Sequence, residues 1–438
     1  PSSSAIDLAA YTFIVDDTVF APSDSDSGSS SSSFSTKKKS GNKSESERER
    51  DEQQSSPSAS GGDGSCAFGQ VGGSGPQVLF GFALARAVLL KLGVRTSSDS
   101  LLLPSLALVA GINLHDLPPT AASWLWEADA AFGLCRGVSW SDTVATPRAW
   151  QLVEGDGSRT QVWRKTAKTG NSNDKEEEEE RAAALLPPLL PSSSSSLSCP
   201  ISIPRSVLEN ARAHHVGLDP LNPKHAPWLS SLREEVGTNA RVTAETFQEC
   251  SARFPTRGEL RSLLRPLDLF SPNEGEAASL VEGEAGRSAI SAARSLLSVA
   301  AEEGEEVKGK GKNFLDAVVV RRGGLGAVLV SRSDSRVFNV PAVSGLALRD
   351  TTGCGNAFLG ALAAAAAASC SKNPFSSSSF DDAALALGVA SAAAAAVAEV
   401  LGTPALSVDL FDLPSKAQVE RAAERALAVR GACVVEEE

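Results

Sequence analysis

The chain has 438 residues, a formal net charge of −12 and no basic stripe along its sequence. This charge argues against nucleic acid as a partner, because phosphate backbones are bound by clustered lysine and arginine. Seven scattered cysteines without a C-x-x-C pair indicate free thiols in a reducing compartment rather than a disulfide framework or a zinc site. We therefore expect a cytoplasmic location. An organelle address stays open, because the chain begins at Pro1 and contains no methionine.

Three stretches lack the apolar side chains that a protein core needs. Residues 22–65 are serine-rich, residues 165–198 combine an acidic block with a serine run, and residues 302–312 are acidic and glycine-rich. Such segments cannot offset their ordering entropy by burial, so we predict disordered inserts at 22–65 and 165–198. The remainder, roughly 350 residues, has the size of one large α/β domain with a small appendage.

The first half of the chain alternates strand-like and helix-like segments. The β-branched and aromatic residues of 6–20 predict a strand or a hairpin, and residues 106–112 predict a strand. Apolar residues at helical spacing predict helices over 75–93 and 121–133, each ending at a glycine. Two alternating runs around a Gly-Asp-Gly turn predict a hairpin over 149–163. This hairpin is the candidate lid, and an edge hairpin of the main sheet is the alternative.

The second half continues the alternation up to two alanine-rich helices. The patterns predict strands at 213–218, 266–270, 315–321, 326–331 and 337–343, and helices near 226–235, 243–252, 273–281, 356–369 and 383–401. Alternation of this kind indicates a mainly parallel sheet covered by helices on both faces. The alanine-rich helices are too weakly hydrophobic for membrane spans. His214 and His215 are expected at the end of a strand, as structural residues rather than catalysts.

The sequence "DTTGCGNAF" at 350–358 leads from a strand that ends near Val343 into a helix. Gly353 and Gly355 allow a tight turn that directs successive backbone N–H groups at one spot. The helix N-terminus adds about half a positive charge there. The result is an anion hole suited to the charge on a transferring phosphoryl group. An ordinary strand-to-helix turn is the alternative, and the long flanking string argues against it.

Asn273 and Glu276 stand three positions apart at a predicted helix start, and therefore on one face of that helix. Amide and carboxylate oxygens suit Mg²⁺, which keeps much of its water. A helix cap with an acid favoured by the helix dipole explains the same spacing, and spacing alone favours the cap.

Four segments in order resemble the PfkB, or ribokinase-like, family of carbohydrate kinases. Residues 350–360 resemble its second signature, D-T-T-G-x-G-D-x-F-x-G, with Asn356 in place of the last Asp. "VGGSGPQVLFGFALARA" at 71–87 is similar to its early Gly-Gly signature. "NEGE" at 273–276 resembles its N-x-x-E element, and "VVVRRGGLGAVLV" at 318–330 resembles the strand–glycine–strand segment before the anion hole. The chain is identified as a divergent member of this family over most of 5–405 outside the inserts.

The resemblance implies a ribokinase-like three-layer α/β/α sandwich with a mainly parallel sheet and a small β lid. The implied division is a first strand region (1–21), a kinase-like domain interrupted by an insert (66–164 with the lid hairpin, 199–410 with the anion hole), and a C-terminal tail helix (411–438). A homodimer formed through the lid is a further expectation.

The implied activity is ATP-dependent phosphoryl transfer to a hydroxyl of a sugar, polyol or nucleoside, with ATP and Mg²⁺ as cofactors and no nucleic-acid or membrane partner. The resemblance assigns an anion hole, a nucleotide site, an acceptor site and a water-mediated Mg²⁺ site. The residues are Gly353, Cys354 and Gly355 for the anion hole; Thr352, Asn273, Glu276 and Gly324 for the nucleotide; Asp16, Gly72 and Gly73 for the acceptor; and Asn273 and Glu276 for Mg²⁺.

Asn356 raises a question about turnover. In the family this position holds the aspartate that acts as general base, and an amide cannot accept that proton at neutral pH. Losing a positioned base costs about 10²–10⁴ in rate, although phosphoryl transfer depends mainly on positioning and charge stabilisation. Two functions therefore stay open. The preferred one is a PfkB-type kinase that is slow or has a displaced base. The other is a weak or inactive pseudokinase that binds nucleotide or sugar as a sensor or interaction partner.

Overall fold

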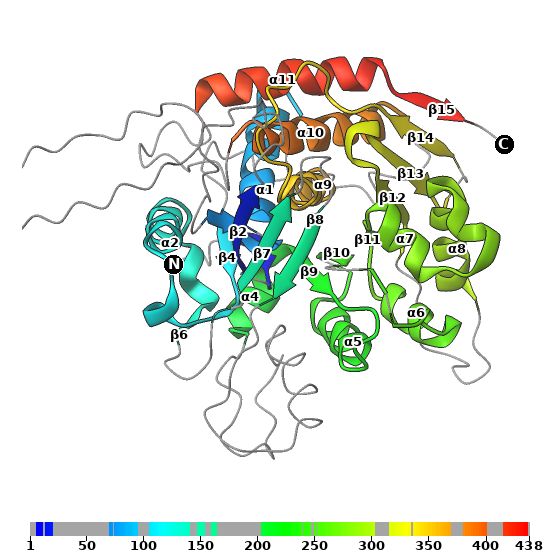
Figure 1. Ribbon diagram of the computed structural model, residues 1–438, viewed down its shortest axis with the longest axis horizontal. Coiled ribbons are helices and arrows are strands. Elements are labelled where there is room, and N and C mark those ends of the chain that lie inside the picture. Colours follow the sequence, from blue (N-terminus) through cyan, green and yellow to red (C-terminus); the bar gives the residue numbers. More distant parts are fainter. Residues whose placement is uncertain are drawn as a thin grey trace, which may run out of the picture.

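The computed structural model describes residues 6–11, 14–20, 70–72, 74–94, 105–140, 146, 148–153, 159–163, 203–238, 240–246, 249–250, 252–302, 315–333, 336–368, 380–400 and 415–436. The predicted disordered inserts lie outside these residues. The described residues form three sheets, of nine, four and two strands, with helices around the largest (Figure 1).

The nine-stranded sheet has the order β15-β14-β13-β12-β11-β10-β9-β1-β4. The strands from β4 to β12 run parallel, and β13, β14 and β15 add an antiparallel edge. This confirms the predicted mainly parallel sheet. The bounds are β1 (Ile6–Ala10), β4 (Leu106–Leu108), β9 (Ala211–Leu218), β10 (Arg241–Thr246), β11 (Leu269–Phe270), β12 (Ala317–Arg321), β13 (Ala327–Ser331), β14 (Val337–Val340) and β15 (Val434–Glu436).

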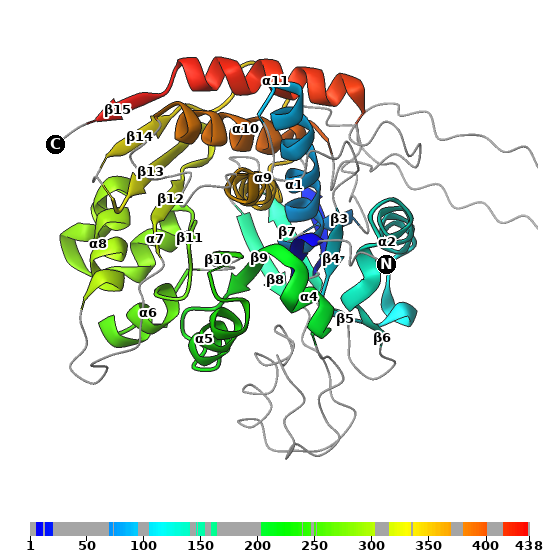
Figure 2. The same cartoon turned by 180° about the vertical axis from the view of Figure 1, so that it is seen from behind.

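Helices cover both faces of this sheet, as Figures 1 and 2 show from opposite sides. Successive strand residues point to opposite faces, so Val319 joins one buried cluster while Val318 and Val320 join the other. The first face carries α1 (Ser74–Lys91), α9 (Cys354–Ala368), α10 (Phe380–Ala398) and α11 (Lys416–Gly431). The second carries α4 (Arg205–Asn210), α5 (His225–Val236), α6 (Arg257–Leu264), α7 (Glu274–Leu280) and α8 (Ala289–Ala301). The predicted three-layer α/β/α sandwich is confirmed.

Helices α1 and α9 pack with their backbones almost in contact. A Cβ atom on Gly81 would lie 2.1 Å from the carbonyl oxygen of Ala357, and one on Gly360 would lie 1.9 Å from that of Val78. The small residues of both helices therefore allow an approach that larger side chains would prevent. In the described part of the chain, no helix is long and apolar enough to span a membrane. The alanine-rich segments serve close packing.

The four-stranded sheet has the order β3-β2-β7-β8. The predicted hairpin at 149–163 is confirmed as the antiparallel pair β7–β8. The prediction of one strand or one hairpin over 6–20 is wrong, because these residues form two strands, of which β1 joins the large sheet and β2 joins this one. This separate sheet matches the small β element of the predicted fold class. The bounds are β3 (Gln70–Gly72), β2 (Ile14–Phe20), β7 (Arg148–Val153) and β8 (Arg159–Trp163).

A third, two-stranded sheet pairs β5 (Gly111–Ile112) with β6 (Ser139–Trp140). The single strand predicted over 106–112 is thereby divided between two sheets. Helix α2 (Pro119–Phe132) ends, as predicted, at Gly133, whose φ of 64° is left-handed.

Two predictions of local structure are corrected. The helix predicted near 243–252 is wrong, since residues 241–246 form β10. Alanine and glutamate there favour a helix, but Val242, Thr243 and Ala244 are fully buried between β9 and β11, and tertiary context overrides propensity. The predicted C-terminal tail helix is incomplete, because α11 is followed by β15, which pairs with β14 at the sheet edge.

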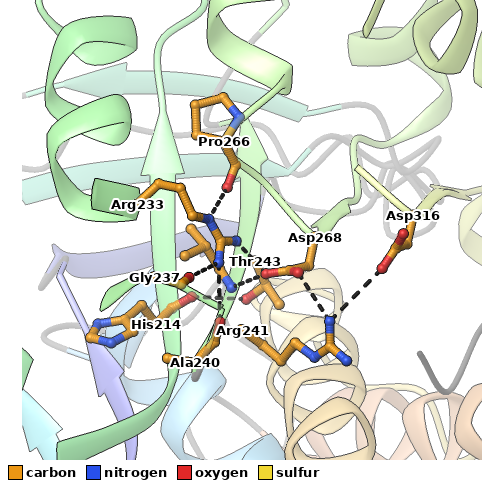
Figure 3. A network of polar contacts seen from close by, with 10 residues as sticks. His214, Arg233, Gly237, Ala240, Arg241, Thr243, Pro266, Asp268 and Asp316 are labelled. Atoms are coloured by element: carbon orange, nitrogen blue, oxygen red, sulfur yellow. Dashed lines mark hydrogen bonds and ion pairs between the residues drawn. The ribbon is translucent and has the colours of Figure 1, made fainter. Parts of the chain in front are cut away.

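An ionic network links residues at the amino ends of β10, β11 and β12 (Figure 3). Arg233 of α5 forms an ion pair with Asp268, and Arg241 Nη1 lies 3.1 Å from Asp268 Oδ1 and 3.8 Å from Asp316 Oδ2. Asp268 Oδ2 also accepts a 2.7 Å hydrogen bond from the Val242 N–H. Burial, followed by the charge of Asp268, raises the pKa of Asp316 to about 6.

Candidate active site

The carboxyl halves of β9, β10 and β12 carry buried polar side chains that meet on one edge of the sheet. His215 comes from β9, Glu245 from β10 and Arg321 from the last position of β12. Helix α7, which follows β11, begins beside them. Carboxyl ends of parallel strands are the usual ligand-binding edge of an open α/β sheet, and the network here lies on that edge.

Asn273 and Glu276 form a complete capping box at the start of α7. Asn273 Oδ1 accepts from the Glu276 N–H at 2.8 Å, and Glu276 Oε2 accepts from the Asn273 N–H at 2.7 Å. The structure therefore brings the two predicted residues together, in the cap that spacing alone favoured. Burial raises the pKa of Glu276, and the Arg321 charge and the Asn273 N–H oppose that shift.

Arg321 joins two buried carboxylates. Its Nη1 donates to Glu245 Oε2 at 3.2 Å and its Nη2 donates to Glu276 Oε2 at 3.4 Å. The side chains of Arg321, Glu245 and Glu276 are 12%, 3% and 8% exposed. On the far side, Glu245 Oε1 lies 3.4 Å from His215 Nε2, and His215 Nδ1 lies 3.1 Å from Thr243 Oγ1. The guanidinium is thus held by a connected polar network.

The loop 350–356 precedes α9 and is locked by its own side chains. Asp350 Oδ1 accepts from the Thr352 N–H at 2.8 Å, and both residues are buried. This is an Asx turn, and it occupies the Thr352 N–H. Gly353 has a φ of 80°, which favours glycine. Helix α9 begins at Cys354, so the Gly355 and Asn356 N–H groups lie in a first turn that the helical ladder leaves open.

The two glycines of this loop lie against side chains from distant elements. A Cβ atom on Gly355 would lie 2.0 Å from Arg321 Nη1, and one on Gly353 would lie 2.5 Å from Gln77 Cδ of α1. Gly355 therefore lies beside a guanidinium that a larger residue would displace, and Gly353, whose φ of 80° favours glycine, lies beside an amide. This arrangement brings a helix N-terminus, a cation and a side-chain amide to one loop.

Gln77 is fully buried, and neither its Oε1 nor its Nε2 finds a hydrogen-bond partner within the described part of the chain. A buried polar group without a partner costs about 1–3 kcal/mol, so the Gln77 amide is a position that a bound ligand or an ordered water would complete. Sequence reasoning missed Gln77, Glu245 and Arg321. The signals for two of them were present, since Gln77 directly follows the Gly-Gly-Ser-Gly-Pro run and Arg321 ends a strand just before a glycine-rich turn.

For the other predicted site residues within the described part of the chain, the structure gives a position in a strand or turn but no contact with the network around Arg321. Gly324 lies in the turn (Gly323–Leu325) between β12 and β13, with open space around its Cα. Asp16 lies in β2, where its backbone is paired with Ala149, and Gly72 ends β3 opposite Ile14. Gly73 lies outside the described residues. Gly72 shortly precedes α1, whose Gln77 lies beside Gly353 of the loop.

The two histidines of β9 are inside the strand rather than at its end. His214 is fully buried, with its Nδ1 2.5 Å from the Tyr11 hydroxyl. Burial, together with the charge of Arg233, lowers the pKa of His214 to about 3. His214 is therefore neutral and packed in the core, which agrees with the structural part expected of it.

Residues 222–408 match the family model described as pfkB family carbohydrate kinase. They include β10 to β14, α7 and the loop before α9, which are the elements that build the site. The chain therefore contains a pfkB family carbohydrate kinase domain. Among curated proteins, none matches the sequence significantly.

Solved structures similar to this one are ribokinases and nucleoside kinases. The ribokinase from Giardia lamblia has a TM-score of 0.58 at 15% identity, over 95% of this chain and 99% of that one. The Arabidopsis thaliana ribokinase complexed with ribose and ATP has 0.52 at 14%, over 96% and 99%. The nucleoside kinase from Burkholderia thailandensis in complex with inosine has 0.51 at 14%, over 97% of both chains. These similarities show the ribokinase-like fold.

Proposed function

We propose that the protein transfers the γ-phosphoryl group of ATP to a hydroxyl of a sugar, polyol or nucleoside. The observation that carries this proposal is the loop 352–356, which lies beside the Arg321 guanidinium and beside the Gln77 amide, an amide without a hydrogen-bond partner among the described residues. A cation and a helix N-terminus attract phosphate, whereas an amide can both donate to and accept from a hydroxyl. The similar structures holding ribose with ATP, and inosine, support this acceptor class.

The phosphates would bind at the start of α9. The Gly355 and Asn356 N–H groups are open there, the turn formed by Gly353 and Cys354 shapes the approach, and the helix dipole favours negative charge. Phosphoryl transfer passes through a loose transition state whose charge lies on the phosphoryl oxygens, so positioning and charge stabilisation supply most of the catalysis. Thr352 takes part through the Asx turn that fixes the loop, and Gly324 borders the nucleotide.

The residues at α7 fit a magnesium ion held through water. Within the described residues, no group of three or more His, Cys, Asp or Glu side chains could hold a metal ion by itself, and Mg²⁺ is typically bound by one or two carboxylates, waters and substrate phosphates. The Glu276 carboxylate, with Asn273 beside it, would supply the protein part of this shell. When bound there, the metal would neutralise the charge on the phosphate oxygens.

The acceptor would bind on the opposite side of the loop. Gln77 is the side chain best suited to hold its hydroxyl, and Asp16, Gly72 and Gly73 precede α1 or lie in the four-stranded sheet. We infer that this sheet closes over the acceptor as a lid, that residues 66–164 and 199–410 act as one kinase-like unit, and that a homodimer forms through the lid. A cytoplasmic location fits cysteines such as Cys135 and Cys250, which form no disulfide within the described residues.

A thermal-shift screen tests the binding half of this proposal. The protein is heated with Mg·ATP, with each sugar, polyol or nucleoside of a panel, and with pairs of the two. We expect stabilisation by Mg·ATP and by one acceptor class, because a ligand that binds only the folded state raises the unfolding temperature. The alternative of binding without transfer has only Asn356 in its favour. No shift with any nucleotide would contradict the proposal.

A further inference from the structure

Arg321 extends from the sheet edge to the first turn of α9. It is the last residue of β12, yet its Nη1 occupies the space directly beside Gly355, 2.0 Å from where a Cβ atom would be. Any residue other than glycine at position 355 would displace the guanidinium. The chain therefore keeps this arginine beside the first turn of α9, whose N–H groups the helical ladder leaves open.

The guanidinium retains a donor after its carboxylate contacts are made. Its two terminal nitrogens donate to Glu245 and Glu276, but the buried Nε finds no hydrogen-bond partner within the described residues. Guanidinium carries five N–H groups in a planar fork that matches the oxygens of a phosphate group. A guanidinium that lies beside Gly355 through Nη1, and whose Nε is still open, thus points toward an anionic ligand.

Electrostatics lead to the same ligand. A helix N-terminus carries a partial positive charge, so a cation placed beside it is unfavourable. The buried carboxylates of Glu245 and Glu276 hold Arg321 there in spite of this repulsion. An anion between the guanidinium and the helix start would turn two repelling positive groups into two favourable contacts.

We propose that Arg321 is a phosphate-binding residue that contacts the transferring phosphoryl group of ATP, with Glu245 and Glu276 as the residues that position it. This rests on the proposed function. In the transfer, a bond forms from the acceptor oxygen to the γ-phosphorus while the bond from that phosphorus to the bridging oxygen of ADP breaks. The hydroxyl proton leaves to solvent. Arg321 stabilises the charge on the phosphoryl oxygens and requires no carboxylate at position 356.

The test is isothermal titration of the full chain with Mg·ATP and with inorganic triphosphate. Arg321→Gln is expected to weaken both affinities roughly 10- to 100-fold, the loss expected for a charged hydrogen bond. Arg321→Lys keeps the charge but loses the planar fork, so its affinity should be intermediate. The matched control is Arg322→Gln, because Arg322 points to Glu274 at 3.5 Å instead of the loop, and its affinity should stay within about twofold of wild type.

A second variant distinguishes a direct contact between Arg321 and phosphate from an indirect structural effect of the substitution. Arg321→Gln removes the cation that neutralises the buried Glu245 and Glu276 carboxylates, which destabilises the fold or repels phosphate on its own account. Glu245→Gln/Arg321→Gln removes one carboxylate together with the cation. Continued weak binding of triphosphate by this double variant supports the contact, and recovery to wild-type affinity overturns it. Wild-type affinity in Arg321→Gln would overturn it as well. If wild type binds neither ATP nor triphosphate, the proposed function itself fails.

Discussion

The Arg321 guanidinium lies against Gly355, across the boundary between the end of β12 and the start of α9. Glycine at 355 is thus explained by a contact with a residue 34 positions earlier as well as by the local turn. A phosphate at this helix start would contact the backbone of α9 and the side chain of Arg321 at the end of β12. Substitutions at Gly355 test this arrangement.

Gly355→Asp is expected to abolish nucleotide binding. The new carboxylate would pair with Arg321 and occupy the position of the phosphate. Mg·ATP titration should show a loss of at least about 100-fold, since both a charged contact and the anion hole are blocked. The control is Gly258→Asp, which adds the same charge to the first turn of α6, where nothing lies within 4 Å. Unchanged ATP affinity in Gly355→Asp would refute the anion hole.

Gln77→Met is expected to stabilise the protein while weakening acceptor binding. The substitution keeps an unbranched side chain of similar length and removes a buried amide that has no partner within the described residues. The free energy of unfolding should rise by up to about 1–2 kcal/mol, and the acceptor KM should rise about tenfold or more. Chemical denaturation measures the first quantity and steady-state kinetics the second. Lower stability would mean that the amide is bonded inside the folded chain.

Glu276→Gln is expected to raise the Mg²⁺ concentration needed for ATP binding. Glutamine still completes a capping box, so α7 should keep its start, while the carboxylate proposed for the metal shell is lost. A magnesium titration at a fixed ATP concentration measures the Mg²⁺ concentration at which ATP binding is half-maximal. Glu259→Gln is the matched control, because Glu259 completes the capping box of α6 on the protein surface. Equal Mg²⁺ requirements in the two variants would argue against Glu276 as a metal residue.

Stability should carry a pH signature from Asp316. Its pKa is about 6 in the folded protein and 3.8 in the reference state, so between about pH 4 and 6 the folded chain holds a proton that the unfolded chain has released. The free energy of unfolding from this group is therefore greatest below pH 4 and falls as the pH rises to 6. Urea unfolding of wild type and Asp316→Asn should differ by a pH-dependent amount in this window. A difference in the free energy of unfolding that stays constant across this pH window would contradict the raised pKa of Asp316.

The parts of the site that sequence predicted are those encoded locally. The capping box of Asn273 and Glu276 needs only a spacing of three, and the turn before α9 needs only its glycines. The glycines at 353 and 355 also predicted the helix start to within two residues, at 356, whereas α9 begins at Cys354. Short-range hydrogen bonds and left-handed φ values leave such signatures in sequence.

The parts that sequence did not predict depend on tertiary register. Arg321 reaches Gly355 only because β12 and α9 meet at one end of the sheet, and Gln77 reaches Gly353 only because α1 packs tightly on α9. Strand β10 was misread as a helix because its burial on both faces comes from its neighbours. The pairing of β15 with β14 joins segments about 100 residues apart, and no local pattern specifies it.

The most direct measurement of the central claim is transfer of the labelled γ-phosphoryl group from ATP to the acceptor class found by the screen, by wild type and by Asn356→Asp. The substitution changes shape little and supplies a proton acceptor in the first turn of α9. We expect slow transfer by wild type and a gain of roughly 10²-fold in the variant if proton transfer limits the rate. Absence of transfer by both proteins, although both bind Mg·ATP and the acceptor, would contradict the account.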